Sequence, residues 1–466
     1  MKEMVVVLYP SPCSGHLMSM VELAKLILHR HPNLSTTILT VNPPFYVGNT
    51  APYIAYISNE FPDIAFLELS PPEFSVDHSL NLETLVFEFI HDSNPSVSKA
   101  LESICEQSNI VAFIMDLFCM TALDVANDMH IPAHVFYTSS AADLAIFLYT
   151  PTLHSRIPIS FRDQKELLIV PGLPLVPPTS MPDPLLDRTN KAYDWFVKAC
   201  NRIALTQGIL VNSFDELEPP RALRALAFGE CTPDVPTPPV YCIGPLIAAS
   251  TSGGDDDCQC LEWLRVQPAA SVVYLCFGSQ GTFSPPQIKE IAIGLENSRQ
   301  RFLWVIHSTR LMHEPDLDAL LPEGFLGRTA EFGMVMTSWA PQVAVLNHPA
   351  VGGFVTHCGW NSALESVCAG VPMLAWPLYA EQHLNALFMV EEMKIAMAME
   401  IGDSGFVDGG AVARCVKGLM ESEKGNMLRD RSKALKEKAA TALSEGGTSR
   451  LSLDAAVEAW LGAVQP

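Results

Sequence analysis

Two polar residues in the first quarter of the chain have side chains suited to moving a proton. His16 follows the apolar run 4–10 through the turn Ser-Pro-Cys-Ser-Gly and opens a helical pattern. Asp116 closes the apolar run 110–115, where a carboxylate is costly unless it is paired. A carboxylate that accepts the ring N–H of a histidine orients the imidazole and stabilises its protonated form. Together they predict a general base and its partner, although a helix-start histidine and a strand-end aspartate are the ordinary interpretation of each alone.

The segment 339–382 holds a second concentration of polar groups at turns. It begins with Trp-Ala-Pro, a rigid turn that carries a large aromatic ring, and continues to the apolar run Gly-Gly-Phe-Val-Thr at 352–356. The turn His-Cys-Gly-Trp-Asn-Ser at 357–362 follows and leads directly into a helical pattern. Such a strand, turn and helix place backbone N–H groups and the positive end of a helix dipole beside an anion. The segment therefore predicts a site for an anionic ligand at the carboxyl end of a strand.

Both sets of residues are embedded in an alternation of strand and helix patterns. Short β-branched runs alternate with amphipathic helical patterns, such as 16–28 and 192–206, which is typical of parallel sheets with right-handed crossovers. The runs that predict strands are 4–9, 36–41, 64–69, 110–116, 133–137 and 208–212 in the first half, and 271–277, 302–307, 334–339, 353–357 and 372–376 in the second.

Length and one break in composition predict two domains. A chain of 466 residues is too long for one ordinary core. The run 248–257, Ala-Ala-Ser-Thr-Ser-Gly-Gly-Asp-Asp-Asp, has the composition of a flexible linker. We expect an α/β fold with two doubly wound parallel-sheet domains, 1–245 and 261–445, joined by a linker at 246–260. The proline-rich stretch 151–190 is expected to be an irregular lid or pocket wall.

Charge and cysteine content exclude several classes of function. The net charge is −22, which argues against nucleic-acid or anionic-membrane partners. The 12 cysteines form no Cys-x-x-Cys pair and indicate reduced thiols in a cytoplasmic protein. We expect no signal peptide, no transmembrane helix and a monomer. No metal is expected, because Asp255–Asp257 and Asp316-Leu317-Asp318 are interpreted as solvated acidic loops.

The segment 339–382 resembles the nucleotide-sugar-binding box of plant UDP-dependent glycosyltransferases. The resemblance rests on its length, on Trp339 and Gln382 at its ends and on the His-Cys-Gly-Trp-Asn-Ser core. Ser-Gly-His at 14–16 and Glu-Gly-Gly-Thr-Ser at 445–449 match the same family, so the resemblance covers essentially the whole chain. It implies the GT-B fold, two Rossmann-like domains facing across a cleft, with a C-terminal helix at about 446–466 that packs back on the N-terminal domain.

The resemblance also implies which residues bind the donor, UDP-glucose, which is a co-substrate and not a cofactor. Trp339 would stack on uracil, His357 would bind the phosphates and Glu365 would accept hydrogen bonds from the ribose. The full set expected to bind UDP is Ser279, Trp339, Ala340, Gln342, His357, Gly359, Asn361, Ser362 and Glu365, and the set expected to hold the sugar is Thr138, Trp360, Glu381 and Gln382. Trp360 in place of the arginine of glucuronate-using relatives disfavours glucuronate.

Several of these residues have an alternative structural interpretation. A lone tryptophan such as Trp339 is usually core, and Ser279 is as readily a turn residue. Ser362-x-x-Glu365 is also the pattern of a helix capping box. Thr138, with the serines that follow it, would equally cap the next helix.

The first domain is expected to bind and activate the acceptor. His16 would act as base with Asp116 as its partner, positions that match the family's catalytic pair. The acceptor pocket is expected to draw on Ser14, Phe87, Phe118, Phe147, Trp195 and Tyr379, although plain core is the more common role for each of the aromatic residues.

The predicted reaction is an inverting transfer of glucose from UDP-glucose to a hydroxyl of a small phenolic acceptor, which gives a β-glucoside. The segment 9–23 resembles the flavonoid and chalcone branch of the family. Transfer to an aromatic carbon, or use of another UDP-sugar, remains open. A nicotinamide dehydrogenase, a serine hydrolase and a non-catalytic sugar-nucleotide binder are less favoured, because no G-x-G-x-x-G or G-x-S-x-G motif is present while His16 and Asp116 both are.

Overall fold

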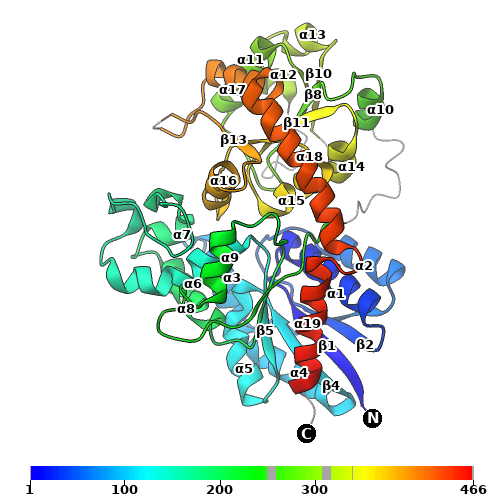
Figure 1. Ribbon diagram of the computed structural model, residues 1–466, viewed down its shortest axis with the longest axis vertical. Coiled ribbons are helices and arrows are strands. Elements are labelled where there is room, and N and C mark those ends of the chain that lie inside the picture. Colours follow the sequence, from blue (N-terminus) through cyan, green and yellow to red (C-terminus); the bar gives the residue numbers. More distant parts are fainter. Residues whose placement is uncertain (1, 249–258, 307–315, 338, 403, 464–466) are drawn as a thin grey trace. The chain divides into compact units, whose positions relative to one another are not determined.

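The computed structural model describes residues 2–248, 259–306, 316–337, 339–402 and 404–463, and these form two compact units (Figure 1). Unit 1 comprises Met1–Ala248 and Thr441–Pro466, and unit 2 comprises Ala249–Ala440. The expected linker at 246–260 lies largely outside the described residues.

Unit 1 is built on a parallel sheet of seven strands in the order β3-β2-β1-β4-β5-β6-β7. The chain runs outward from β1 to β3 and then returns to place β4 on the other side of β1. The carboxyl ends of β1 and β4 therefore form the point where the strand order reverses. The strands are β1 Glu3–Tyr9, β2 Leu34–Thr40, β3 Ile64–Glu68, β4 Ser108–Met115, β5 Ala133–Tyr137, β6 Ile209–Val211 and β7 Val240–Cys242.

Helices cover this sheet because the strands at its centre are apolar on both faces. In β1, residues 5–9 are all buried, and in β4 residues 110–115 are, so neither face can be left to water. The helices of unit 1 are α1 Ser14–Arg30, α2 Ala51–Glu60, α3 Leu82–Asp92, α4 Asn94–Gln107, η1 Leu117–Ala122, α5 Leu123–Asp128, α6 Ala141–Arg156, η2 Phe161–Asp163, η3 Pro178–Ser180, α7 Asp183–Leu186, α8 Lys191–Ile203, α9 Pro220–Ala227 and α19 Thr448–Ala463.

Unit 2 repeats the plan with six parallel strands in the order β10-β9-β8-β11-β12-β13. Here the strand order reverses between β8 and β11. The strands are β8 Val272–Cys276, β9 Arg301–Val305, β10 Gly333–Met336, β11 Val351–Thr356, β12 Met373–Ala375 and β13 Ala396–Ala398; the helices are α10 Gln259–Arg265, α11 Pro285–Ser298, α12 Leu317–Leu320, α13 Phe325–Thr329, α14 Gln342–Asn347, α15 Trp360–Ala369, α16 Gln382–Glu391, α17 Gly409–Glu421 and α18 Glu423–Leu443, which ends in unit 1.

The predicted α/β architecture is confirmed, with three differences in detail. The strands β7 and β13 are absent from the sequence-based prediction, because β7 lies among prolines, which are typical of loops, and β13 consists of alanine and methionine, which favour helices. The expected irregular stretch 151–190 begins later than predicted, since α6 continues through Pro151 to Arg156. Beyond that point the stretch contains only short helical turns and one antiparallel bridge between Leu168 and Val176.

The C-terminal helix α19 completes the core of unit 1. It lies beside β4 and β7 (Figure 1), and Leu453, Ala456, Val457 and Trp460 join the same apolar cluster as α1. The ring of Trp460 contacts that of His134 in β5, with centroids 5.5 Å apart. None of the helices in the described part of the chain combines the length and apolarity needed to cross a bilayer.

We expect Trp460→Ala to destabilise unit 1 by about 3–5 kcal/mol, because it opens a cavity in a packed core. Trp460 is 1% exposed, whereas Leu451 on the same helix is 57% exposed. Leu451→Ala is therefore the matched control and should change the free energy of unfolding by less than about 0.5 kcal/mol. Chemical denaturation followed by tryptophan-independent circular dichroism measures both, and equal effects of the two substitutions would contradict the assigned packing.

Candidate active site

His16 and Asp116 are brought together at the point where the strand order of unit 1 reverses. His16 is in the first turn of α1, directly after β1, and Asp116 directly follows β4. His16 Nδ1 donates to Asp116 Oδ2 over 2.7 Å. The histidine side chain is 29% exposed and that of the aspartate 1%. Because Nδ1 of the neutral ring carries the proton that it donates to the carboxylate in this hydrogen bond, the basic lone pair lies on Nε2.

The backbone around Asp116 fixes the direction of its carboxylate. The N–H of Asp116 donates to the carbonyl of Tyr9 at the end of β1 (3.0 Å). Its Oδ1 accepts from the N–H of Phe118, which caps η1 (3.0 Å). One carboxylate oxygen thus caps a helix while the other holds the imidazole. The same side chain therefore has the structural role expected at a strand end and also pairs with the predicted base.

A cluster of aromatic rings lies next to the His16 imidazole. Phe118 meets the imidazole edge-on with centroids 5.7 Å apart and also contacts Phe87 at 4.7 Å. Phe87 stacks against Trp195 at 5.9 Å and an interplanar angle of 7°. These rings come from η1, α3 and α8, which pack against one another. The expected acceptor residues of this unit are therefore neighbours of the predicted base.

Burial divides the cluster into supporting rings and accessible ones. Phe87 and Phe147 are buried, whereas Phe118, Trp195 and the nearby Ser14 are only partly buried. Phe196, which sequence reasoning missed, contacts Phe87, Phe118 and Phe147. Its signal was the neighbouring Trp195, since two consecutive aromatic residues in an amphipathic helix lie on adjoining parts of one face.

In the turn after β5, Thr138 is not the residue that caps the following helix. Ser140 is the N-cap of α6, and its hydroxyl accepts from the N–H of Asp143 (3.0 Å). Thr138 is two residues earlier and partly buried. Helix capping therefore falls to Ser140, and Thr138 lies at the carboxyl end of the strand beside β4.

In unit 2, the turn between β11 and α15 presents a helix start without a side-chain cap. Cys358 has a positive φ of 68°, and its N–H donates to the hydroxyl of Thr356 (3.2 Å). Gly359 is the N-cap of α15 and supplies no side chain to the first turn. The positive end of the helix dipole is consequently left for an external anion. Asn361, in that first turn, is partly buried.

His357 lies in a slot formed by two glycines. A Cβ on Gly359 would lie 2.4 Å from His357 Nε2, and one on Gly278, which has a φ of +72°, would lie 2.7 Å from it. These distances allow only glycine at both positions while the ring stays in place. Burial lowers the pKa of His357 to about 4, and its Nδ1 has no hydrogen-bond partner among the described residues. The imidazole is therefore neutral near pH 7 and keeps hydrogen-bonding capacity for a ligand.

Gln342 connects two of the predicted UDP-binding residues. Its Nε2 donates to Ser362 Oγ (2.8 Å) and to Glu365 Oε2 (2.7 Å). The capping-box alternative for Ser362 and Glu365 is wrong, because the N-cap of α15 is Gly359 and Ser362 is inside the helix. Burial raises the pKa of Glu365 to about 7, and the hydrogen bond from Gln342 opposes that rise.

The remaining predicted UDP-binding residues differ in exposure. Trp339 is 65% exposed, so the core interpretation of this ring is wrong and its face is accessible for stacking. Ala340 beside it is buried. Ser279 is an exposed residue in the turn after β8, which is the neighbour of β11 at the reversal of strand order.

Two of the residues predicted to hold the sugar, Glu381 and Gln382, lie at the start of α16. Gln382 Oε1 accepts from the N–H groups of Leu378 and Tyr379 (3.0 Å each), and its side chain also hydrogen-bonds that of Tyr379. The Tyr379 ring lies 6.3 Å from that of His357. Trp360 is buried at the first turn of α15.

Asn385 links this group to the phosphate turn and was not predicted. Its Nδ2 donates to the carbonyl of Cys358 (3.0 Å) and to Glu381 Oε1 (3.2 Å), and the residue is fully buried. Because Asn385 follows Glu381 by one helical turn, the sequence contained a weak signal. The contact with Cys358 spans 27 residues and had no signal.

The acidic runs have structural roles where they are described. Asp316 is the N-cap of α12, and its side chain accepts from the N–H of Asp318 (3.1 Å). Asp255–Asp257 lie outside the described residues. Within the described ranges, no group of three or more His, Cys, Asp or Glu side chains is arranged to hold a metal ion.

Comparison with known proteins decides the family. The family described as "UDP-glucoronosyl and UDP-glucosyl transferase" matches residues 238–429. A phloretin 2'-O-glucosyltransferase of Malus domestica is 46% identical over 96% of this chain and 98% of its own length. An anthocyanidin 5,3-O-glucosyltransferase of a Rosa hybrid cultivar is 43% identical over 98% of both chains. The chain belongs to the UDP-glycosyltransferase family.

Solved structures confirm the fold of this UDP-glycosyltransferase. A Polygonum tinctorium UDP-glucosyltransferase capable of glucosylating indoxyl has a TM-score of 0.89 at 35% identity, with 99% of both chains covered. A Phytolacca americana enzyme in complex with UDP-2fluoro-glucose and pterostilbene has a TM-score of 0.86 at 37% identity, covering 98% of this chain and 99% of its own. The GT-B fold expected from the resemblance is thereby confirmed.

The raised pKa of Glu365 predicts a pH-dependent stability for this UDP-glycosyltransferase. The pKa is about 7 in the folded chain and 4.5 for the ordinary side chain, so the folded state binds the proton more tightly. The contribution of this group is fully present below about pH 4.5 and is lost as the pH rises through about 7, a difference of about 3 kcal/mol.

Denaturant unfolding at pH 5, 6, 7 and 8 measures this effect. Glu365→Gln should lose less stability than the wild type between pH 5 and pH 8, since the amide does not titrate. Glu323→Gln, at an exposed position of the same unit, serves as the control and should follow the wild type. Identical pH slopes for wild type and Glu365→Gln would contradict the buried environment assigned to the carboxyl.

Proposed function

We propose that this enzyme transfers glucose from UDP-glucose to a hydroxyl of a small phenolic acceptor and inverts the anomeric carbon to give a β-glucoside. The observation that carries the proposal is the 2.7 Å hydrogen bond between His16 and Asp116, in a unit whose aromatic cluster adjoins the imidazole. The curated relatives named for phloretin and anthocyanidin glucosylation support the phenolic acceptor class.

In the proposed reaction His16 is the general base. Its Nε2 takes the proton of the acceptor hydroxyl while the hydroxyl oxygen forms a bond to the anomeric carbon of glucose. The bond from that carbon to the β-phosphate oxygen breaks, and UDP leaves with the electron pair. Asp116 stabilises the imidazolium that results, since its carboxylate already accepts the Nδ1 proton.

The leaving diphosphate is proposed to bind at the start of α15. The uncapped first turn, with Asn361 and Ser362, offers N–H groups and the helix dipole, and the neutral His357 offers a hydrogen bond without bringing a second charge into the slot. Ser279 is a further phosphate contact on this proposal. A local arrangement of dipoles is needed because the chain as a whole carries a net charge of −22.

The uridine and the sugar are assigned to the neighbouring groups. The exposed ring of Trp339 stacks on uracil, with Ala340 beside it, and the Gln342–Glu365 pair holds the ribose. Glu381, Gln382, Trp360 and Thr138 orient the glucose hydroxyls. Unit 2 is thus the proposed donor-binding domain and unit 1 the acceptor-binding domain, with Tyr379 as a contribution of unit 2 to the acceptor.

Aromatic side chains favour a flat acceptor with an acidic hydroxyl. Phe118 and Trp195 present partly buried rings that can stack on a phenol or polyphenol, with Phe87 and Phe147 behind them. A phenolic proton is easier for an imidazole to remove than an aliphatic one, since the two pKa values are closer. We place the reaction in the cytoplasm and in a monomer, as the cysteine pattern and the composition predict.

An assay of a phenolic panel with UDP-glucose tests the proposal directly. Products are identified by NMR, which reports the anomeric configuration and distinguishes a C–O bond from a C–C bond. A β-O-glucoside is the expected product. An α-glucoside, or transfer only to non-aromatic alcohols, would overturn the proposal, and a C-glucoside would replace it with the alternative reaction on an aromatic carbon.

We expect His16→Ala to reduce transfer by at least about 100-fold because it removes the general base. Asp116→Asn should have a comparable effect, since the amide still caps η1 but favours the imidazole tautomer with its proton on Nε2. Calorimetric titration with UDP should give a Kd within about twofold of wild type for both, as UDP contacts neither residue in the proposed complex. Loss of UDP binding together with transfer would contradict the role of His16 as base.

Gly359→Ala is expected to weaken UDP binding by about tenfold or more, because the added Cβ would displace His357 from its slot. The backbone of Gly359 has a φ of −61° and a ψ of 136°, which alanine also adopts. Gly327→Ala is the control, since nothing lies within 4 Å of the position that its new methyl group would take. Titration calorimetry with UDP compares the two variants, and equal affinities would remove His357 from the phosphate site.

A further inference from the structure

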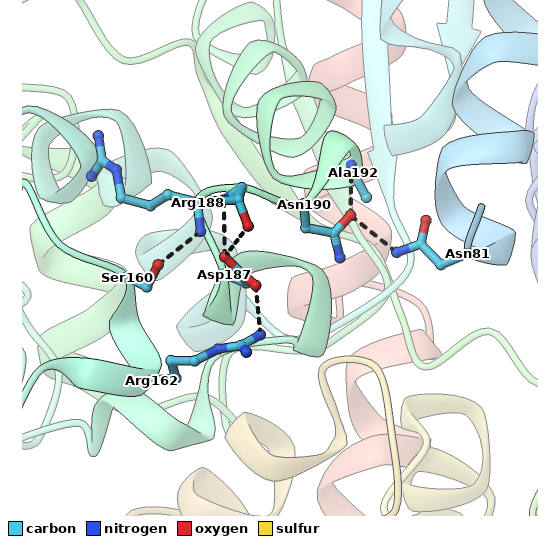
Figure 2. Close-up of polar contacts among 8 residues, drawn as sticks. Asn81, Ser160, Arg162, Asp187, Arg188, Asn190 and Ala192 are labelled. Atoms are coloured by element: carbon cyan, nitrogen blue, oxygen red, sulfur yellow. Dashed lines mark hydrogen bonds and ion pairs between the residues drawn. The ribbon is translucent and has the colours of Figure 1, made fainter. Parts of the chain in front are cut away.

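Two asparagines join the helices that carry the acceptor aromatics. Asn81 is the N-cap of α3, the helix of Phe87, and Asn190 is the N-cap of α8, the helix of Trp195. Asn81 Nδ2 donates to Asn190 Oδ1 over 3.3 Å, as Figure 2 shows. Two helix starts that are 109 residues apart in the chain are therefore tied through their own capping side chains.

The surrounding hydrogen bonds determine which amide is the donor. Asn81 Oδ1 accepts from the N–H of Thr84 (3.1 Å), and Asn190 Oδ1 accepts from the N–H of Ala192 (3.0 Å; Figure 2). Backbone N–H groups only donate, so both of these side-chain atoms are oxygens. The NH₂ group of Asn81 must then be the donor between the two caps. Asn190 takes part only as an acceptor.

The other end of α8 is held to a different element. Arg202 donates to the carbonyl of Met120 in η1 (3.3 Å) and pairs with Asp124 in α5 (2.7 Å). The N-terminal end of α8 follows the irregular stretch in which Asp187 pairs with Arg162 and the N–H of Arg188 donates to Ser160 (Figure 2). A second tie between α3 and α8 is the ion pair of Lys191 with Glu88, whose lysine is 56% exposed and is expected to contribute little.

The rings that follow these caps face one another. Phe87 of α3 stacks on Trp195 of α8 and meets Phe196 edge-on at 5.1 Å. Trp195 is five residues, less than two helical turns, from Asn190. A change in the separation of the helix starts therefore changes the separation of the rings.

We propose that Asn81 and Asn190 are positioning residues that fix the packing of α3 against α8, and so the position of the partly buried Trp195 ring at the aromatic acceptor site and its selection of flat acceptors. The inference rests on the proposed function. Neither residue touches the reacting atoms; the pair keeps Phe87 and Trp195 at a fixed spacing before the acceptor arrives. The acceptor then does not have to order the two helices when it binds.

Because Asn81 donates and Asn190 accepts, substitutions of similar size and polarity can either keep or remove this hydrogen bond. Asn190→Asp keeps both functions of Asn190, because a carboxylate still accepts from Ala192 and from Asn81. Asn81→Ser keeps a favoured N-cap and, with a shorter side chain, removes the NH₂ group that reaches Asn190 without a change in charge. The double variant Asn81→Asp with Asn190→Asp keeps both caps and places two carboxylates against each other.

Steady-state kinetics with phloretin and UDP-glucose test the pair. Asn81→Ser and the double variant should raise the KM for phloretin by about three- to tenfold, while the KM for UDP-glucose stays within twofold. Asn190→Asp and Lys191→Gln should resemble the wild type in both constants. An unchanged phloretin KM in both disrupted variants, equal changes in the two KM values, or loss in Asn190→Asp as large as in the double variant would each overturn the inference.

Amide hydrogen exchange provides a readout that does not require turnover. Residues 192–196 should exchange faster in Asn81→Ser and in the double variant than in the wild type and Asn190→Asp. If the wild type glucosylates none of the phenols, the proposed function fails, and with it the effect on acceptor choice. A difference in exchange rate among the variants would still show that the asparagine pair holds α8 to α3. Equal exchange rates in all variants would refute that role.

Discussion

Parallel strands end at a common edge of their sheet, and in a doubly wound sheet the connections leave that edge in opposite directions where the strand order reverses. Side chains that follow two neighbouring strands at this point are not covered by a crossover helix. In unit 1 the position is shared by β1 and β4, and it holds His16 and Asp116. In unit 2 it is shared by β8 and β11, and it holds Gly278, Ser279 and the turn from His357 to Gly359. The same topological rule thus positions the proposed general base in one unit and the proposed phosphate site in the other.

The two sites place their ionisable groups in different surroundings. His16 is partly exposed, and its ring donates a hydrogen bond to a buried carboxylate. His357 is buried without a charged partner, and its pKa falls to about 4. In the proposed reaction the first imidazole collects a proton, and the second remains neutral beside a diphosphate. Because both lie where a strand is followed by a helix, their surroundings and not their positions in the motif separate the proposed roles.

Sequence patterns predicted most of the architecture because residue periodicity is a local property. Long apolar strands such as β4 and the turn 357–362 combine several local signals that agree. The pairing of His16 with Asp116 could also be predicted, since both residues follow strands that the alternation places in one sheet. Strand β7 lies among prolines and β13 consists of helix-favouring residues, and the helical turn after Pro151 contradicts the usual effect of proline.

Contacts between distant segments account for what the sequence did not reveal. The bond from Asn385 to Cys358 and the closeness of Gly278 to His357 join residues from different crossovers. The same holds for Phe196, whose ring contacts come from α3, η1 and α6. These contacts depend on where each helix begins and how it is turned about its axis. Sequence periodicity leaves the start of a helix uncertain by one or two residues.

The position of α19 in unit 1 has a consequence for biosynthesis. The ribosome completes the first 248 residues well before it reaches Trp460, and at 5–20 residues per second the interval is on the order of ten seconds or more. During that time the apolar surface of α1 and β4 that later receives Leu453, Val457 and Trp460 has no cover from its own chain. The nascent first unit therefore exposes an apolar surface that chaperones and neighbouring polypeptides can bind until translation is almost finished.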